Sequence, residues 1–148
     1  MPAPRDDPKR HCRDIIRQCL NIAEEKGDHF VAVHRDNDAE CVVLITMLRA
    51  QPVMSVIVAD KLAIATENEK SMYRLANDMN RESITGWHTL LVSGGSIIYM
   101  YRQCLWMSCE LTREHLMDIL CTCIAEYKSG KATLTAGDHA GASHLQKG

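Results

Sequence analysis

Residues 86–102 read GWHTLLVSGGSIIYMYR, and this stretch decides the fold of the chain. Two runs rich in apolar residues, 86–93 and 96–106, flank the pair Gly94-Gly95. Glycine adopts the positive φ angles of a two-residue hairpin turn without steric cost. The stretch therefore predicts a β-hairpin, and the segments around it must supply the rest of a sheet and the helices that cover it.

The hexapeptide NDMNRE, residues 77–82, stands directly before the hairpin and admits two interpretations. Its asparagines, aspartate and arginine could form the polar centre of a small active site. No nucleophile precedes them, however, and asparagine amides bind backbone groups that a helix end leaves unpaired. We therefore interpret Asn77 and Asn80, together with Gly94 and Gly95, as a structural motif that fixes a helix against the sheet.

A helix is predicted on each side of the hairpin. Thr66 and Glu69 have the spacing of a capping box, and apolar residues at helical spacing continue from there into the NDMNRE segment. After the hairpin, Thr112 opens a helix over residues 113–128, and Gly130 follows its expected end.

The first part of the chain predicts one amphipathic helix and three strands. Residues 9–26 carry apolar side chains at three- and four-residue spacing, and Gly27 is expected to end that helix. Residues 29–35, 41–48 and 53–59 are rich in β-branched side chains and predict strands. The resulting order, α-β-β-β-α-β-β-α, predicts an α+β fold in which helices pack on an antiparallel sheet.

The totals describe an ordinary globular chain. It has 148 residues, of which 46% are hydrophobic and 24% charged, and no Pro/Gly/Ser-rich linker divides it. We expect residues 1–130 to form a single α+β domain. Residues 131–148 are small and polar, which predicts a flexible C-terminal tail.

Charge and cysteine content limit the classes of partner. The formal net charge of −2 leaves no basic surface for nucleic acid. No apolar run reaches the ~18 residues that a membrane span needs. Seven cysteines, an odd number, and an N-terminus without an apolar signal region favour a reduced compartment. The expected location is cytoplasmic, with neither nucleic acid nor membrane as a partner.

Three segments carry a resemblance to a known family. YRLANDMNRE ends the second predicted helix, GWHTLLVSGGSIIYMYR forms the hairpin, and SCELTREHLMDIL leads into the last helix. In order and spacing they resemble the YbjN group of bacterial sensory transduction regulators, within the type III secretion chaperone-like fold. The similarity is clearest over residues 72–128 and only architectural over residues 9–60. For this chain the resemblance implies a homodimer that binds apolar surface of a client protein, without an enzymatic site.

Cys123 is predicted to be a core residue and not a ligand, while Cys121 falls beside the helical face that carries His115, Asp118 and Thr122. Cys121 and Cys123 are two residues apart, which on a helix turns their side chains about 200° from each other. Cys12 and Cys19 would lie ~10 Å apart along their helix, too far for a disulfide. The C-x₂-C spacing of a zinc site does not occur.

Two further groups of polar residues are weak candidates for a site. His115, Asp118 and Thr122 share one helical face, but charged neighbours indicate that this face is solvated and not a catalytic triad. His34 and Cys41 could face each other across a hairpin, where no further ligand accompanies them. We therefore expect no catalytic residue, no metal and no cofactor.

The feature with a functional consequence is the apolar excess of the predicted sheet. Residues 41–48 are apolar at nearly every position, so both faces of that strand need cover. Three helices with narrow apolar stripes leave one face for a partner. The candidate interface residues are Val43, Ile45, Met47, Ile98, Met100 and Trp106.

Two functions follow from this pattern. The preferred hypothesis is a non-enzymatic, chaperone-like or regulatory protein that acts as a homodimer and covers apolar surface of an unidentified protein partner. The alternative is a sensor of a small ligand or of thiol redox state, which would use the seven Cys and eight Met.

Overall fold

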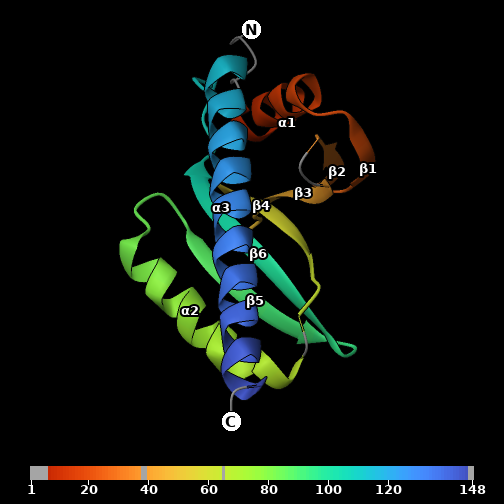
Figure 1. Cartoon of the computed structure of the whole chain (residues 1–148). Coiled ribbons are helices and arrows are strands. Elements are labelled where there is room, and N and C mark those ends of the chain that lie inside the picture. Colours follow the sequence, from red (N-terminus) through yellow and green to blue (C-terminus); the bar gives the residue numbers. More distant parts are fainter. Residues whose placement is uncertain (1–6, 38–39, 65, 147–148) are drawn as a thin grey trace, which may run out of the picture.

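A six-stranded antiparallel sheet carries the helices of the chain, and α3 crosses in front of it with α1 and α2 on either side (Figure 1). The computed structural model describes residues 7–37, 40–64 and 66–146, with side chains described in these ranges except for residues 66 and 139–146. The strands follow the order β1-β2-β3-β4-β6-β5 across the sheet. This arrangement confirms the predicted α+β class.

The elements have the following bounds. The helices are α1 (Pro8–Cys19), the short 3-10 helix η1 (Thr66–Asn68), α2 (Glu69–Glu82) and α3 (Arg113–Gln146). The strands are β1 (Ile22–Lys26), β2 (His29–Arg35), β3 (Glu40–Met47), β4 (Val53–Leu62), β5 (Trp87–Ser93) and β6 (Ser96–Trp106).

The hairpin that decides the fold is present as predicted. Strands β5 and β6 pair from Trp87↔Arg102 to Ser93↔Ser96. Gly94 and Gly95 between them have φ angles of 58° and 77°. Both angles lie in the left-handed region that favours glycine, which is the reason a Gly-Gly pair specifies this tight turn.

The first helix was predicted over residues 9–26, but residues 22–26 form a strand instead. It ends at Cys19, and β1 then pairs with β2 through Lys26↔His29. Gly27, with a φ of 59°, is therefore a hairpin residue and not the helix stop. Pairing along the open edge of β2 overrides the helical spacing of the apolar residues, because local propensity is weak against tertiary hydrogen bonds.

The start of α2 also differs from the prediction. The α-helix has Asn68 as its N-cap, after the 3-10 turn η1. The Thr66 side chain, on which the expected capping box depends, lies outside the described residues. The Asn68 amide donates to Asp138 Oδ1 at 2.5 Å, on the last helix. The start of α2 is thereby tied to α3.

The last helix is longer than predicted. Thr112 begins it as expected, with its hydroxyl accepting from the N–H of His115 at 3.1 Å. Gly130, however, does not end the helix, which continues to Gln146, and the expected tail from residue 131 is helical over that range. Leu134 is fully buried in this extension, so packing outweighs the helix-weakening effect of glycine. Residues 147 and 148 of the expected tail lie outside the described residues.

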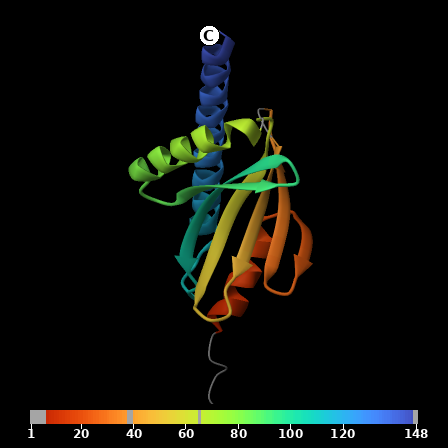
Figure 2. The ribbon, with the colours of Figure 1, turned by 90° about the horizontal axis from the view of Figure 1, so that it is seen from below.

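Strand alternation gives the sheet one core face. Along β6, Ile97, Tyr99 and Tyr101 are buried while the residues between them are not. In β3 the same alternation buries Cys41, Val43, Ile45 and Met47. These positions form one continuous core with the buried residues of the helices. All three α-helices therefore pack on this face, and Figure 2 shows α2 crossing α3 above the β5–β6 hairpin.

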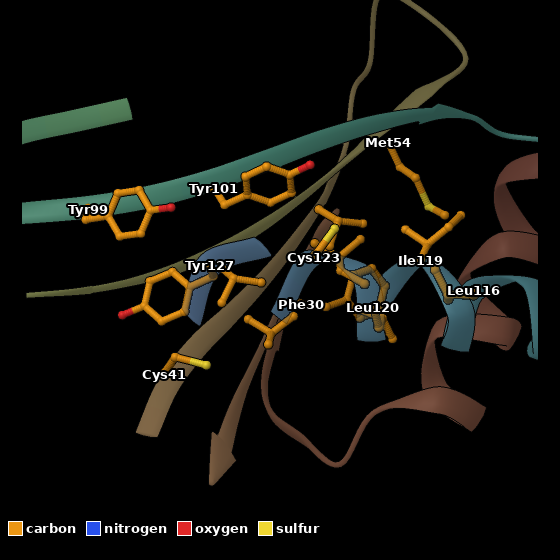
Figure 3. Close-up of a cluster of buried hydrophobic side chains, with 14 of the residues drawn as sticks. Phe30, Cys41, Met54, Tyr99, Tyr101, Leu116, Ile119, Leu120, Cys123 and Tyr127 are labelled. Atoms are coloured by element: carbon orange, nitrogen blue, oxygen red, sulfur yellow. The ribbon is translucent and has the colours of Figure 1, made fainter. Parts of the chain in front are cut away.

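Tyrosines supply much of the core volume. Tyr99 and Tyr101 project from β6, and Tyr127 projects from α3 toward them (Figure 3). The rings of Tyr99 and Tyr127 stack, with their centroids 5.2 Å apart. Aromatic pairs at this separation contribute about 0.5–1.5 kcal/mol beyond their burial. In a chain with only seven Phe, Trp and Tyr residues, these three tyrosines help to hold α3 on the sheet.

Charged groups fix α1 to the sheet. The Asp28 carboxylate, in the β1–β2 turn, binds Lys9 Nζ at 2.9 Å and Arg13 Nη2 at 3.0 Å, and Arg49 lies 3.6 Å away. The Lys9 ammonium hydrogen bond, aided by the nearby arginines, holds the pKa of Asp28 below its usual range. On the other side of α1, the ring of His11 lies 2.7 Å from the Leu111 carbonyl oxygen.

Candidate functional site

No helix of the described residues packs on the second face of the sheet. We call it the open sheet face, defined by the side chains that alternate with the core positions. Its apolar members are Val31, Val33, Val42, Leu44, Ile57, Ala59, Trp87, Leu91, Ile98, Met100 and Trp106. The strand register places these side chains opposite one another on neighbouring strands, for example Val33 opposite Val42 and Leu91 opposite Ile98.

Several of these side chains are large and solvent-exposed. Trp106 is 70% exposed, Leu91 50%, Val33 42% and Trp87 40%. The ring of Trp87 has Arg102 over it, with the guanidinium carbon 5.8 Å from the ring centroid. Apolar side chains that gather on one exposed face mark interaction surfaces more often than scattered ones do.

The structure divides the six predicted interface residues into two sets. Ile98, Met100 and Trp106 lie on the open sheet face, as β6 alternation requires. The prediction is wrong for Val43, Ile45 and Met47, which are at most 2% exposed and pack beneath the helices. The register of strand pairing decides which residues of adjacent strands share a face, and the sequence alone does not show that register.

The two edges of the sheet differ in charge. Edge strand β1 carries Glu24, Glu25 and Lys26, which discourage pairing with a foreign strand. Edge strand β5, WHTLLVS, has no acidic or basic residue apart from His88. The α2 helix lies along this second edge and protects it through one side chain.

That side chain is Asn80, one of the four predicted motif residues. Its Oδ1 accepts from the backbone N–H of His88 at 2.6 Å, and its Nδ2 donates to the His88 carbonyl at 2.9 Å. The amide thus occupies the outward backbone groups of β5 in the way that a neighbouring strand would. Asn77, by contrast, is exposed and makes no side-chain hydrogen bond with any described residue.

His88 is a buried polar residue that the sequence analysis did not single out. It is 6% exposed, and its Nδ1 lies 2.6 Å from the Tyr99 hydroxyl, whose ring stacks on the imidazole. Burial lowers the pKa of His88, partly opposed by the nearby Glu126 carboxylate. Burial also raises the pKa of Tyr99, so its hydroxyl stays protonated. The available signal was the alternation of β5, which places His88 on the same face of the strand as Leu90 and Val92.

The cysteines fall into buried, exposed and half-buried groups, and the half-buried ones are Cys19 and Cys109. Cys12, Cys41 and Cys123 are buried, and burial raises the pKa of the Cys123 thiol to about 12. Cys121 and Cys104 are exposed, the latter on the open sheet face. The expected core position is therefore confirmed for Cys123, and Cys121 is exposed beside His115, Asp118 and Thr122, as expected.

The other weak candidates do not converge on a site. His115, Asp118 and Thr122 are all exposed on α3, with no core partner for a triad. His34 pairs with Cys41 across β2 and β3, but its ring binds Asp36 at 3.0 Å. Within the described residues, no three His, Cys, Asp or Glu side chains are arranged to hold a metal ion. No helix in the described ranges has the length and apolar character needed to cross a membrane.

Comparison with known proteins supports the fold and leaves the family open. No family model matches the chain, and no curated protein is similar in sequence. Among solved structures, YbjN from E. coli, which is described provisionally as a transcription regulator, superposes with a TM-score of 0.61. The match covers 86% of this chain and 93% of that chain at 13% identity. This chain therefore shares the YbjN fold.

Proposed function

We propose that this chain is a non-enzymatic regulatory protein of the YbjN type, which acts as a homodimer and covers apolar surface of a protein partner. The observation that carries the proposal is the open sheet face, where Trp, Leu and Val side chains stay exposed because no helix or strand in the described part of the chain covers them. The fold shared with YbjN supports a regulatory or binding role for this surface. The cytoplasm is the proposed compartment, because the exposed thiols persist where the medium is reducing.

The size of the face suits a specific protein interface. Strands spaced ~4.8 Å apart and ~3.3 Å long per residue give a face roughly 25 Å wide and, over seven residues, roughly 23 Å long. The product of these two lengths, roughly 600 Å², is of the same order as the roughly 800 Å² per partner of a standard interface. Burial of apolar surface contributes about 25 cal/mol per Å², against the cost of association.

Substitutions that place a charged side chain on the open sheet face test whether the chain forms a homodimer. Light scattering behind a sizing column is expected to give a dimer for the natural chain and a monomer for Val42→Lys and Leu91→Lys. Ile84→Lys is the matched control, because Ile84 is 97% exposed in the loop between α2 and β5 and lies outside the face. A strict monomer at high micromolar concentration for the natural chain would contradict the homodimer.

Capture experiments with the same variants test the protein partner. The natural chain and Ile84→Lys are expected to retain one shared protein from host lysate, and Val42→Lys is expected to lose it. Retention of the same proteins by all three baits would show that the open sheet face is not the binding surface.

A thiol redox sensor is the second candidate. The observation in its favour is Cys104, an exposed thiol on the open sheet face, where oxidation would change the surface offered to a partner. If oxidation of the natural chain leaves its oligomeric state unchanged, and Cys104→Ser behaves identically, this candidate fails.

A further inference from the structure

A cleft lies between α2 and α3, on the opposite side of the molecule from the open sheet face. Its volume is about 320 Å³. Ligand sites for small molecules begin at about 300 Å³, so the cleft suits a compact molecule. The residues that give it its chemistry are Met79, Glu82, His88, Glu126, Ser129 and Thr133.

The floor of the cleft presents a fixed hydrogen-bond donor. The Tyr99 hydroxyl has His88 Nδ1 as its hydrogen-bond partner among the described residues. We assign the proton of this bond to the hydroxyl, which makes Nδ1 the acceptor and places the proton of the neutral imidazole on Nε2, a tautomer that the spectra described below test. His88 is 6% exposed and lines the cleft. Its Nε2 makes no hydrogen bond with any described residue. The Nε2–H group is thus available to a ligand.

Close packing holds this donor in place. Asn80 fixes the backbone of His88 on both sides, and the Tyr99 ring stacks on the imidazole. Gly130 of α3 lies so near that a Cβ there would overlap the Tyr99 hydroxyl and come within 3.1 Å of His88 Nδ1. A donor held by three neighbours loses little conformational freedom when a ligand binds.

The rim of the cleft is acidic. Glu82 comes from the last turn of α2 and Glu126 from α3, and no lysine or arginine is among the described residues that line the cleft. Ser83 and Thr133 donate to the carbonyl oxygens of Gly86 and Ser129, so their hydroxyl oxygens can accept from a ligand. Two carboxylates and several acceptors around a neutral histidine attract a cation.

We propose that this cleft binds a small organic cation that carries an ammonium or guanidinium group next to a carbonyl or hydroxyl oxygen. The cationic group binds the carboxylates of Glu82 and Glu126, while the oxygen accepts from His88 Nε2–H. Charge-assisted hydrogen bonds of this kind are roughly twice as strong as neutral ones. The site is separate from the open sheet face and independent of the proposed homodimer.

Two amide probes and a neutral analogue test the site. Argininamide and glycinamide carry the cation and the oxygen, and propionamide carries the oxygen alone. Long-range ¹H–¹⁵N spectra of the natural chain are expected to show His88 protonated on Nε2, with signals that shift saturably with both cations and not with propionamide. Protonation on Nδ1, or the absence of a saturable shift at millimolar cation, would overturn the proposal.

Charge-removing variants locate the binding. Glu82→Gln and Glu126→Gln are each expected to weaken the binding of argininamide about tenfold, the equivalent of one charged hydrogen bond. Asp118→Asn is the matched control, because it removes one charge from the exposed face of α3, outside the cleft. Equal weakening by all three variants would indicate attraction by net charge alone and would also overturn the site.

Discussion

Asn80 of α2 binds both backbone groups of His88 on β5, with its oxygen 2.6 Å from the N–H and its nitrogen 2.9 Å from the carbonyl. One side chain thereby joins a helix to the edge of the sheet and closes that edge to foreign strands at this position. The same contact sets the position of the imidazole that lines the α2–α3 cleft. Stability, edge protection and the proposed ligand site therefore depend on one amide.

Replacement of Asn80 by alanine is expected to destabilise the protein by about 2 kcal/mol. The variant loses two hydrogen bonds, each of which contributes about 1 kcal/mol, and leaves part-buried backbone groups of His88 without a protein partner. Urea denaturation followed by circular dichroism measures the change.

Asn77→Ala is the control for that variant. Asn77 is exposed on the same helix, and such surface substitutions stay within about 0.5 kcal/mol. Equal losses from both variants would mean that the Asn80 contact with β5 does not stabilise the fold.

Gly130→Ala is expected to destabilise the protein by about 2 kcal/mol, although alanine favours helices by up to ~1 kcal/mol. A Cβ at Gly130 would overlap the Tyr99 hydroxyl and force α3 away from β6. At Gly137 the nearest atom is the end of the flexible Leu75 side chain, 2.8 Å away, so Gly137→Ala should be neutral or slightly stabilising. Thermal denaturation of both variants measures the contrast, and a larger loss at Gly137 would contradict this description of α3 packing.

The protein is expected to lose stability as the pH falls below the ordinary histidine pKa of about 6.5. Burial lowers the pKa of His88, so the unfolded state takes up a proton first, and the loss grows from the ordinary histidine pKa down to the lowered one. Asp28, whose pKa is lowered by Lys9 and the nearby arginines, adds a further loss at more acidic pH. Urea midpoints across this range provide the measurement, with the His88 titration followed by NMR. Greater stability at the acidic end of the range would contradict the predicted direction of the stability change.

Native thiol labelling is expected to separate the cysteines into two groups. Cys104 and Cys121 are exposed and should react with a small maleimide before denaturation. Cys12, Cys41 and Cys123 are buried with raised pKa values, so the reactive thiolate is scarce and inaccessible. Mass spectrometry of the labelled peptides identifies the sites. Labelling of Cys123 at the rate of Cys121 would show that α3 opens readily from the sheet.

Local signals in the sequence were sufficient for much of the fold. Gly94-Gly95 predicted its hairpin because turn geometry depends on the residues of the turn themselves. Thr112 predicted the start of α3 for the same reason, since an N-cap bonds within its own turn. Asn80 was placed correctly at the end of α2, but its bonding partner lies on β5, which only the folded chain reveals.

The errors arose where contacts between residues far apart in the sequence determine the local structure. Residues 22–26 have helical spacing but pair with β2, and residues beyond Gly130 stay helical because Leu134 is buried. The face assignment of Val43 relative to Ile98 depends on the register across β3, β4 and β6. The role of His88 depends on Tyr99, eleven residues away on the partner strand. None of these relations is encoded in a single local pattern.

The length of α3 has a consequence for synthesis. This helix contacts α1, α2, β4 and β6, and it begins only after the whole sheet has been translated. A nascent chain that has emerged as far as Trp106 therefore exposes apolar residues on both faces of its strands. These residues remain exposed until α3 leaves the ribosome. Chains interrupted inside α3 are expected to depend on cellular chaperones or to be degraded, because exposed strands and apolar surface promote aggregation.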